Sequence, residues 1–210
     1  AFDLACVSHL SAIKGSVPFI HFFDGFRTSH EIQKIKLTDY SKLEKMVDKK
    51  ALENFRKNAL NPENPSLRGT AQNDDVYFQN REACNKFYNK IPEIVENYMN
   101  EINKENGTNY KPFNYYGAKD AEKIIIAMGS VCETIEEVID YLSSKGEKVG
   151  LIKVHLYRPF SAKHLLREIP KSVKTISVLD RTKEPGSIAE PLYLDVLAAL
   201  KEEKKESLKL

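Results

Sequence analysis

The sequence predicts an α/β protein whose C-terminal half forms a mostly parallel βαβ sheet covered by helices. Three short apolar runs indicate buried strands, at residues 124–128, 149–156 and 175–179. Residues with helical periodicity lie between and after them, at 131–145, 162–168 and 189–200. Strands that alternate with helices of this size are typical of a parallel sheet with right-handed connections.

The N-terminal half is predicted to be mainly helical. Apolar residues recur at three and four over residues 2–14, between 38 and 60, and between 77 and 106. Pro92 indicates either a kink or two helices that meet there. Residues 61–75 are rich in proline and turn formers and predict a long irregular connection, in which Arg68, Gly69 and Thr70 are expected to serve loop packing.

One stretch, VPFIHFFDGFRTSHEIQKI over residues 17–35, combines an apolar run with a polar cluster. Its run Pro18–Phe23 predicts a buried strand, and the pair Asp24-Gly25 predicts a turn. The candidate site residues that follow are Asp24, Arg27, Thr28, Ser29, His30 and Glu31. They are interpreted either as a site beyond a strand end or as a loop with ordinary ion pairs. A third interpretation, a joint between domains of a larger enzyme, depends on the family resemblance described below, and in that enzyme Arg27→Ala is expected to lower activity or assembly more than Arg181→Ala.

A second set of candidates follows the three strands of the C-terminal half. Because parallel strands end at the same edge of a sheet, these residues are expected to share an anion-binding or docking edge: Ser130, Arg158, Arg181 and Lys183. Gly129-Ser130 lacks the further glycines of a dinucleotide fingerprint. Ser130 is instead expected to cap the following helix, with Glu133 completing a capping box. No catalytic residue and no metal ligand is assigned.

Composition excludes several classes of function. The 210 residues hold 32 basic and 30 acidic side chains, so no basic surface favours nucleic acid. No apolar run is long enough to cross a membrane, and no signal peptide is expected at the N-terminus. Cys6, Cys84 and Cys132 are scattered, which argues against metal or iron–sulfur ligation in this segment and favours a reducing, cytoplasmic location.

Four long runs resemble the pyruvate:ferredoxin (flavodoxin) oxidoreductases: HFFDGFRTSHEIQKI, NPENPSLRGTAQNDDVYFQNREACNKFY, AMGSVCETIEEVIDYL and GLIKVHLYRPFS. The resemblance implies a parent enzyme with thiamine diphosphate, Mg and [4Fe-4S] clusters. Such an enzyme converts pyruvate and coenzyme A to acetyl-CoA and CO2, reduces ferredoxin or flavodoxin, and is expected to be a homodimer.

The resemblance also implies a division into domains. Residues 1–37 would end a pyrimidine-binding-like domain, 38–117 would form a helical and irregular connecting region, and 118–201 would form a transketolase C-terminal-like α/β domain. Residues 202–210 are a charged tail.

Parts of the family pattern are missing from these 210 residues: the substrate-contacting Thr and Arg, the metal–diphosphate motif and the cysteine clusters. The chain is therefore expected to be a fragment that holds no cofactor, is inactive alone, and serves a structural role between the remaining domains of the parent. Ferredoxin or flavodoxin would bind through those other domains. Two alternatives stay open: a stand-alone anion- or CoA-binding docking module, and a segment of a related 2-oxoacid:ferredoxin oxidoreductase.

Overall fold

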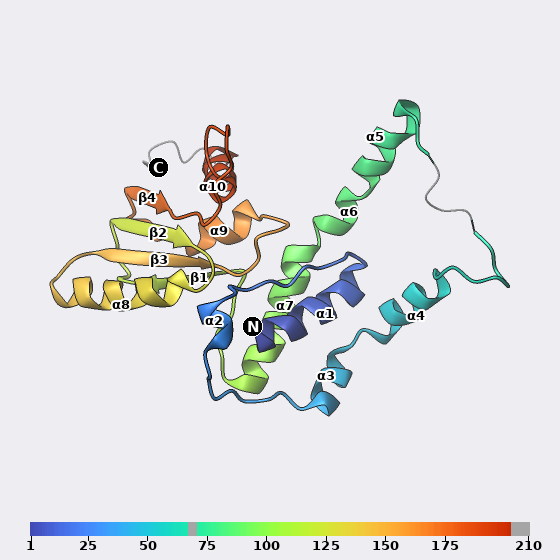
Figure 1. Cartoon of the computed structure of the whole chain (residues 1–210), viewed down its shortest axis with the longest axis horizontal. Helices are drawn as coiled ribbons and strands as arrows, with labels where there is room; N and C mark the ends of the chain where they lie inside the picture. The colour runs from blue at the N-terminus through green and yellow to red at the C-terminus, as the bar shows by residue number, and fades with distance from the viewer. Residues whose placement is uncertain (67–70, 203–210) are drawn as a thin grey trace. The chain divides into compact units, whose positions relative to one another are not determined.

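The protein consists of two compact units in the computed structural model, which describes residues 1–66 and 71–202 (Figure 1). One unit combines Ala1–Phe22 with Ile35–Asn109, and the other combines Phe23–Lys34 with the chain from Tyr110 onward. The expectation for Arg68, Gly69 and Thr70 lies outside the described residues, as does all but the first residue of the charged tail. The predicted domain boundaries at residues 37, 117 and 201 stay a prediction.

Helices make up the first unit. In chain order they are α1 (Phe2–Gly15), α3 (Tyr40–Met46), α4 (Lys49–Lys57), α5 (Asp74–Ala83), α6 (Asn85–Tyr88) and α7 (Ile91–Asn106). Asp39 caps α3 by accepting a hydrogen bond from the Ser41 N–H, as Asx residues at helix starts do. Pro92 lies in the first turn of α7, which follows α6 after two residues, so the expectation of two helices that meet there is confirmed.

The core of the first unit lies between α1 and α7. Both helices present apolar residues at helical spacing, and the buried ones are Val7, Leu10, Ile91, Val95, Tyr98, Met99 and Ile102. The helices approach closely at Gly15, where an added Cβ would lie 2.4 Å from Ile91 Cδ1. Asn106 Nδ2 donates to Asp3 Oδ1 and to Thr38 Oγ1, which ties the end of α7 to α1 and to the chain before α3.

The second unit is a four-stranded mixed sheet in the order β1-β3-β2-β4. Its strands are β1 (Phe113–Gly117), β2 (Lys123–Ala127), β3 (Val149–Val154) and β4 (Thr175–Val178). The strand β2 runs parallel to both neighbours, with Ile125 opposite Leu151 on β3 and Ser177 on β4. The α/β class and the mostly parallel sheet predicted from the sequence are therefore confirmed.

The strand β1 is not among the three strands that the sequence predicts. It adds antiparallel to β3 at the edge of the sheet, with Phe113 opposite Val154. Its side chains alternate between the two faces of the sheet, since Phe113 and Tyr115 pack in the cluster with Ile152 and Tyr116 packs in the cluster with Leu151. Only a period of two over five residues could have revealed it, and a run this short gives a weak signal.

Helices cover both faces of this sheet. The helices α9 (Ala162–Glu168) and α10 (Pro191–Glu202) pack on one face, where Ile126, Ile152 and Ile176 meet Leu165 and Leu192. The helix α8 (Val131–Ser144) packs on the other face, in a cluster of Ala127, Cys132, Ile139 and Leu151. Consecutive residues such as Ile126 and Ala127 point to opposite faces, so a strand covered on both sides is apolar throughout.

The strand predicted at Pro18–Phe23 is wrong. Residues 17–25 lie in no strand or helix, and the side chains of Ile20, Phe22 and Phe23 are 87%, 63% and 63% exposed. The apolar pattern indicates strand propensity, but a strand also needs a neighbouring strand for its backbone hydrogen bonds. No described strand pairs with this segment. Among the described residues, no helix is long and apolar enough to cross a membrane.

Candidate functional site

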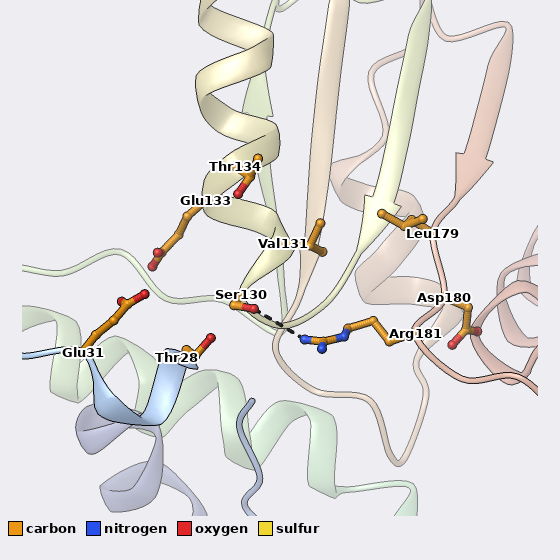
Figure 2. Close-up of a pocket in the computed structure, with 9 residues that line it drawn as sticks. All are labelled: Thr28, Glu31, Ser130, Val131, Glu133, Thr134, Leu179, Asp180 and Arg181. Atoms are coloured by element: carbon orange, nitrogen blue, oxygen red, sulfur yellow. Dashed lines mark hydrogen bonds between the residues drawn. The ribbon is translucent and has the colours of Figure 1, made fainter. Parts of the chain in front are cut away.

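The candidate site is a cavity of about 500 Å³ beyond the carboxyl ends of β2 and β4, shown in Figure 2. The short helix α2 (Arg27–His30), the start of α8 and the loop after β4 surround it. All of them belong to the second unit. The lining residues are Thr28, Glu31, Ser130, Val131, Glu133, Thr134, Leu179, Asp180 and Arg181.

The central contact joins Asp24 to the start of α8. The chain leaves β2, turns at Gly129 with a positive φ of 83°, and enters α8 after Ser130. Asp24 Oδ2 accepts a hydrogen bond from the Ser130 N–H at 2.5 Å. A Cβ at Gly129 would lie 2.8 Å from the same oxygen, so a glycine leaves room for the carboxylate. A helix N-terminus favours such an anion because its first N–H groups lack helical partners.

Arg181 holds the other side of the Asp24 carboxylate. It follows β4, and its guanidinium forms an ion pair with Asp24 Oδ1 and donates from Nη1 to Ser130 Oγ at 3.4 Å (Figure 2). The hydrogen bonds from Ser130, and after them the Arg181 charge, hold the pKa of the Asp24 carboxyl below its usual value. Asp24, Ser130 and Arg181, which we call the carboxylate joint, therefore connect residues 23–34 to the sheet edge.

The capping box predicted for α8 does not form. Ser130 has helical backbone angles at the N-cap position, and its side chain makes no capping hydrogen bond. The Asp24 carboxylate accepts the Ser130 N–H instead, which is the donor that the Glu133 side chain would bind in a capping box. Glu133, which the capping box would have engaged, extends toward Glu31 across the cavity in Figure 2.

The other basic residues of the predicted edge also have carboxylate partners. Arg158 Nη1 lies 2.6 Å from Asp195 Oδ2, and its guanidinium stacks over the Tyr157 ring. Lys183 Nζ lies 2.6 Å from Glu190 Oε1. Neither Arg158 nor Lys183 lines the cavity.

The cavity itself carries more acidic than basic residues. Glu31, Glu133 and Asp180 line it, against one basic residue, Arg181, which is already paired. Asp180 binds the N–H groups of Thr182 and Leu192, so that it caps α10. The geometry therefore does not favour binding of an anion or of coenzyme A at this edge.

Only some residues of the polar cluster after Asp24 line the cavity. Thr28 and Glu31 line the cavity, whereas Ser29 Oγ and His30 Nδ1 contact the Phe26 carbonyl within their own turn. Arg27 is exposed, and no ion pair of Arg27 is present among the described residues. Of the two arginines, Arg181 makes the contacts with Asp24 and Ser130, although the sequence analysis ranked Arg27 first.

Sequence reasoning missed the role of Asp180. Asp180 follows β4 closely, but ten residues separate it from α10, so the local N-cap pattern does not reveal its contact with the Leu192 N–H. The pairing of Asp24 with Ser130 left no local signal either, because the two residues lie 106 positions apart.

Two of the three thiols, those of Cys6 and Cys132, are unsuited to nucleophilic chemistry. Burial raises the pKa of Cys132 to about 11, and burial also raises the pKa of Cys6. Cys84 is half-buried and contacts the Asn80 carbonyl one turn earlier. Cys6 and Cys132 are therefore packed side chains rather than reactive ones.

The start of α8 does not fit the diphosphate of thiamine diphosphate. A diphosphate would need the free N–H groups of a helix start, and at α8 the Asp24 carboxylate already fills that place. Among the described residues, no group of three histidine, cysteine or carboxylate side chains is arranged to bind a metal ion. No chemical step at this site is therefore assigned to that cofactor.

Two family models match the chain in order. The model described as "Pyruvate flavodoxin/ferredoxin oxidoreductase, thiamine diP-bdg" matches residues 1–100. The model described as "Pyruvate:ferredoxin oxidoreductase core domain II" matches residues 121–210.

Curated relatives are similar over nearly the whole chain. The pyruvate-flavodoxin oxidoreductase of Enterobacter agglomerans is 65% identical over 94% of the chain, and the pyruvate:ferredoxin oxidoreductase of Moorella thermoacetica is 58% identical over 98%. The pyruvate dehydrogenase [NADP(+)] of Cryptosporidium parvum is 53% identical over 94%. The chain spans 17%, 18% and 10% of the lengths of these three relatives.

Proposed function

Because the chain belongs to the pyruvate flavodoxin/ferredoxin oxidoreductase family, we propose that it is a segment of an enzyme that cleaves pyruvate oxidatively. That enzyme would convert pyruvate and coenzyme A to acetyl-CoA and CO2 and pass the electrons to ferredoxin or flavodoxin. The proposal rests on the match of two family models, which cover residues 1–100 and 121–210 in order. The chain spans about a sixth of the length of a relative such as the pyruvate-flavodoxin oxidoreductase of Enterobacter agglomerans.

Within that enzyme the segment would have a structural role between domains. The carboxylate joint supports this role, because a single carboxylate binds both a helix start and an arginine from another strand end. Such a contact fixes the path of residues 23–34 without using a reactive group. Thr28 and Glu31 then lie at the cavity edge, where they would face a neighbouring domain of the parent.

The choice of electron acceptor would lie elsewhere in the parent. Similar segments occur in relatives named for flavodoxin, for ferredoxin and for NADP(+), so a segment common to all three does not determine the acceptor. Thiamine diphosphate, Mg and the [4Fe-4S] clusters would bind to other domains, as would the electron carrier. We also propose that the parent enzyme is a homodimer and that it is located in the reducing cytoplasm.

A dye-reduction assay tests this function. The full-length protein that carries this segment should reduce a viologen with pyruvate and coenzyme A, and it should do so faster than with other 2-oxoacids. The isolated 210-residue chain should show no turnover. Turnover by the isolated chain would overturn the structural role, and a preference of the full-length protein for 2-oxoglutarate would show a related 2-oxoacid oxidoreductase instead.

A further inference from the structure

The end of α7 carries the one asparagine of the sequence that is followed by a glycine, in the pair Asn106-Gly107. An asparagine in such a pair is chemically labile, because the following backbone nitrogen can attack the side-chain amide and a glycine, which has no Cβ, hinders that attack least. The helix ends at Asn106, and Gly107 continues in the left-handed conformation with a φ of 74°. Gly107 is exposed, and an added Cβ there would meet nothing within 4 Å. The pair therefore lies where the backbone has room to move.

The Asn106 side chain makes two contacts that use its amide nitrogen. Nδ2 lies 2.7 Å from Asp3 Oδ1, in the first turn of α1, and 2.8 Å from Thr38 Oγ1. Thr38 is 3% exposed, and Asn106 is half-buried. One amide group thus links three segments of the first unit, which are α1, α7 and the chain before α3.

Replacement of this amide by a carboxylate would affect its two partners differently. The Thr38 hydroxyl both accepts and donates hydrogen bonds, so it can donate to a carboxylate at position 106. The Asp3 carboxylate only accepts, so it loses its donor. Two carboxylates this close repel each other, and the contact between the start of α1 and the end of α7 is then lost.

From these contacts we propose that Asn106 is a site of spontaneous deamidation, and that this modification detaches the first turn of α1 from the end of α7. The Gly107 nitrogen loses its proton to the solvent and attacks Cγ of Asn106. A new N–Cγ bond forms, and the Cγ–Nδ2 bond breaks as the departing nitrogen takes up a proton and leaves as ammonia. Water then opens the succinimide ring at either carbonyl, which gives aspartate or isoaspartate.

The net reaction consumes one water and releases one ammonia, so it needs no enzyme, oxidant or reductant. It also does not depend on the proposed enzymatic function, because every group that reacts belongs to this chain.

Hydrogen bonds in the folded protein control the rate of this reaction. The Gly107 N–H donates to the Asn103 carbonyl at 2.8 Å, and this bond must open before the nitrogen can attack. Helix ends open more readily than helix centres, so the reaction proceeds through fraying of the last turn of α7. Once a carboxylate stands at position 106, its repulsion from Asp3 favours the frayed turn. The ammonia is lost to solvent, so the change is one-way.

Mass spectrometry of the 210-residue chain tests the site. The chain is incubated in mildly alkaline buffer, which favours loss of the proton from the Gly107 nitrogen. Deamidation at Asn106 should be at least about tenfold faster than at Asn103, where the following Lys104 carries a Cβ. Asn103 lies one turn earlier in the same helix and is the matched internal control. Equal rates at the two asparagines would overturn the proposed site.

Substitutions test the structural consequence by chemical denaturation and hydrogen exchange. An Asn106→Asp variant should unfold at a lower denaturant concentration than the unmodified chain, with faster exchange in the first turn of α1. The Asp3→Asn variant should change little, because an amide oxygen at position 3 still accepts from Asn106 Nδ2.

The double variant D3N/N106D makes the test specific, because it exchanges the donor and the acceptor between positions 3 and 106. It should regain most of the stability lost in N106D, and the remaining difference reflects a carboxylate at the negative end of a helix. An N106D variant as stable as the unmodified chain, or a double variant as unstable as N106D, would overturn the proposed link between the modification and α1.

Discussion

The Asp24 carboxylate accepts the N–H of Ser130, a residue 106 positions later in the chain. This hydrogen bond fills the N-terminus of α8 with an anion that the protein itself supplies. It explains why Gly129 is a glycine, why Ser130 does not cap the helix with its side chain, and why Arg181 turns toward the sheet edge. Predictions about the site follow from the same contact.

Replacement of Asp24 by alanine should release residues 23–34 from the sheet edge. The Ser130 N–H then loses its acceptor, and the loss of a helix-capping carboxylate lowers the free energy of unfolding by about 1 kcal/mol. Hydrogen exchange measured by mass spectrometry should show faster exchange in residues 23–34 and at the start of α8. The control is Asp120→Ala, which removes an exposed carboxylate paired with Lys148 and should change neither. Equal effects of the two variants would contradict the joint.

Replacement of Gly129 by alanine should destabilise the protein more than replacement of Gly146. Both glycines have a positive φ, of 83° and 85°, so alanine costs about 1 kcal/mol of backbone strain at each. At Gly129 the new Cβ also meets Asp24 Oδ2, whereas at Gly146 it meets nothing within 4 Å. Chemical denaturation measures both variants, and a Gly146 variant as unstable as the Gly129 variant would show that the carboxylate is not confined.

Replacement of Arg181 by alanine should raise the pKa of the Asp24 carboxyl, whereas Arg27→Ala should leave that pKa unchanged. Among the described residues, Arg181 alone forms an ion pair with Asp24, and removal of a nearby positive charge disfavours the ionised form. A carboxyl titration by NMR measures the shift. The effect on stability should stay below about 1 kcal/mol, because the Arg181 side chain is 53% exposed and water screens the pair. A larger pKa change in the Arg27 variant than in the Arg181 variant would contradict the pairing of Arg181 with Asp24.

Acidification should weaken the second unit through His155. Burial, the largest cause, lowers the pKa of this histidine, while its Nδ1 contact with the Lys111 carbonyl opposes the shift. A lowered pKa means that the unfolded chain binds the proton more readily, so this contribution is present above about pH 6.5 and is lost as the pH falls toward the folded pKa. Two nearby charges also act on the pKa of His155: that of Lys153 lowers it, and that of Glu136 raises it.

The measurement is the free energy of unfolding between pH 5 and 8. The dependence on pH should shrink in a His155→Gln variant and persist in a His30→Gln variant, whose imidazole is exposed. An unchanged slope in the His155 variant would assign the pH dependence to other groups.

Much of the fold was predictable because its signals are local. The helices α1 and α7 and the three parallel strands come from periodicity and from breakers such as Gly107, which ends α7 in the left-handed conformation. The edge strand β1 was missed because five residues carry too little periodicity. The run Pro18–Phe23 was misread because strand propensity does not say whether a pairing neighbour exists.

The candidate site was likewise predictable only in part. The sequence placed Ser130, Arg158 and Arg181 at one edge, since parallel strands end together, and that shared edge follows from topology alone. It could not show that each cation there already has a carboxylate partner, because Asp195 and Asp24 come from distant parts of the chain.

The sequence by itself determined the α/β class, the helix and strand periods and the family resemblance, because each is written in neighbouring residues. Only the tertiary structure decided what the stretch around Asp24 does. A carboxylate in a turn can serve as an acid, a ligand or a cap, and the choice depends on which donors the fold brings to it. Here the fold brings the start of α8 and Arg181, and their positive charge makes Asp24 a joint.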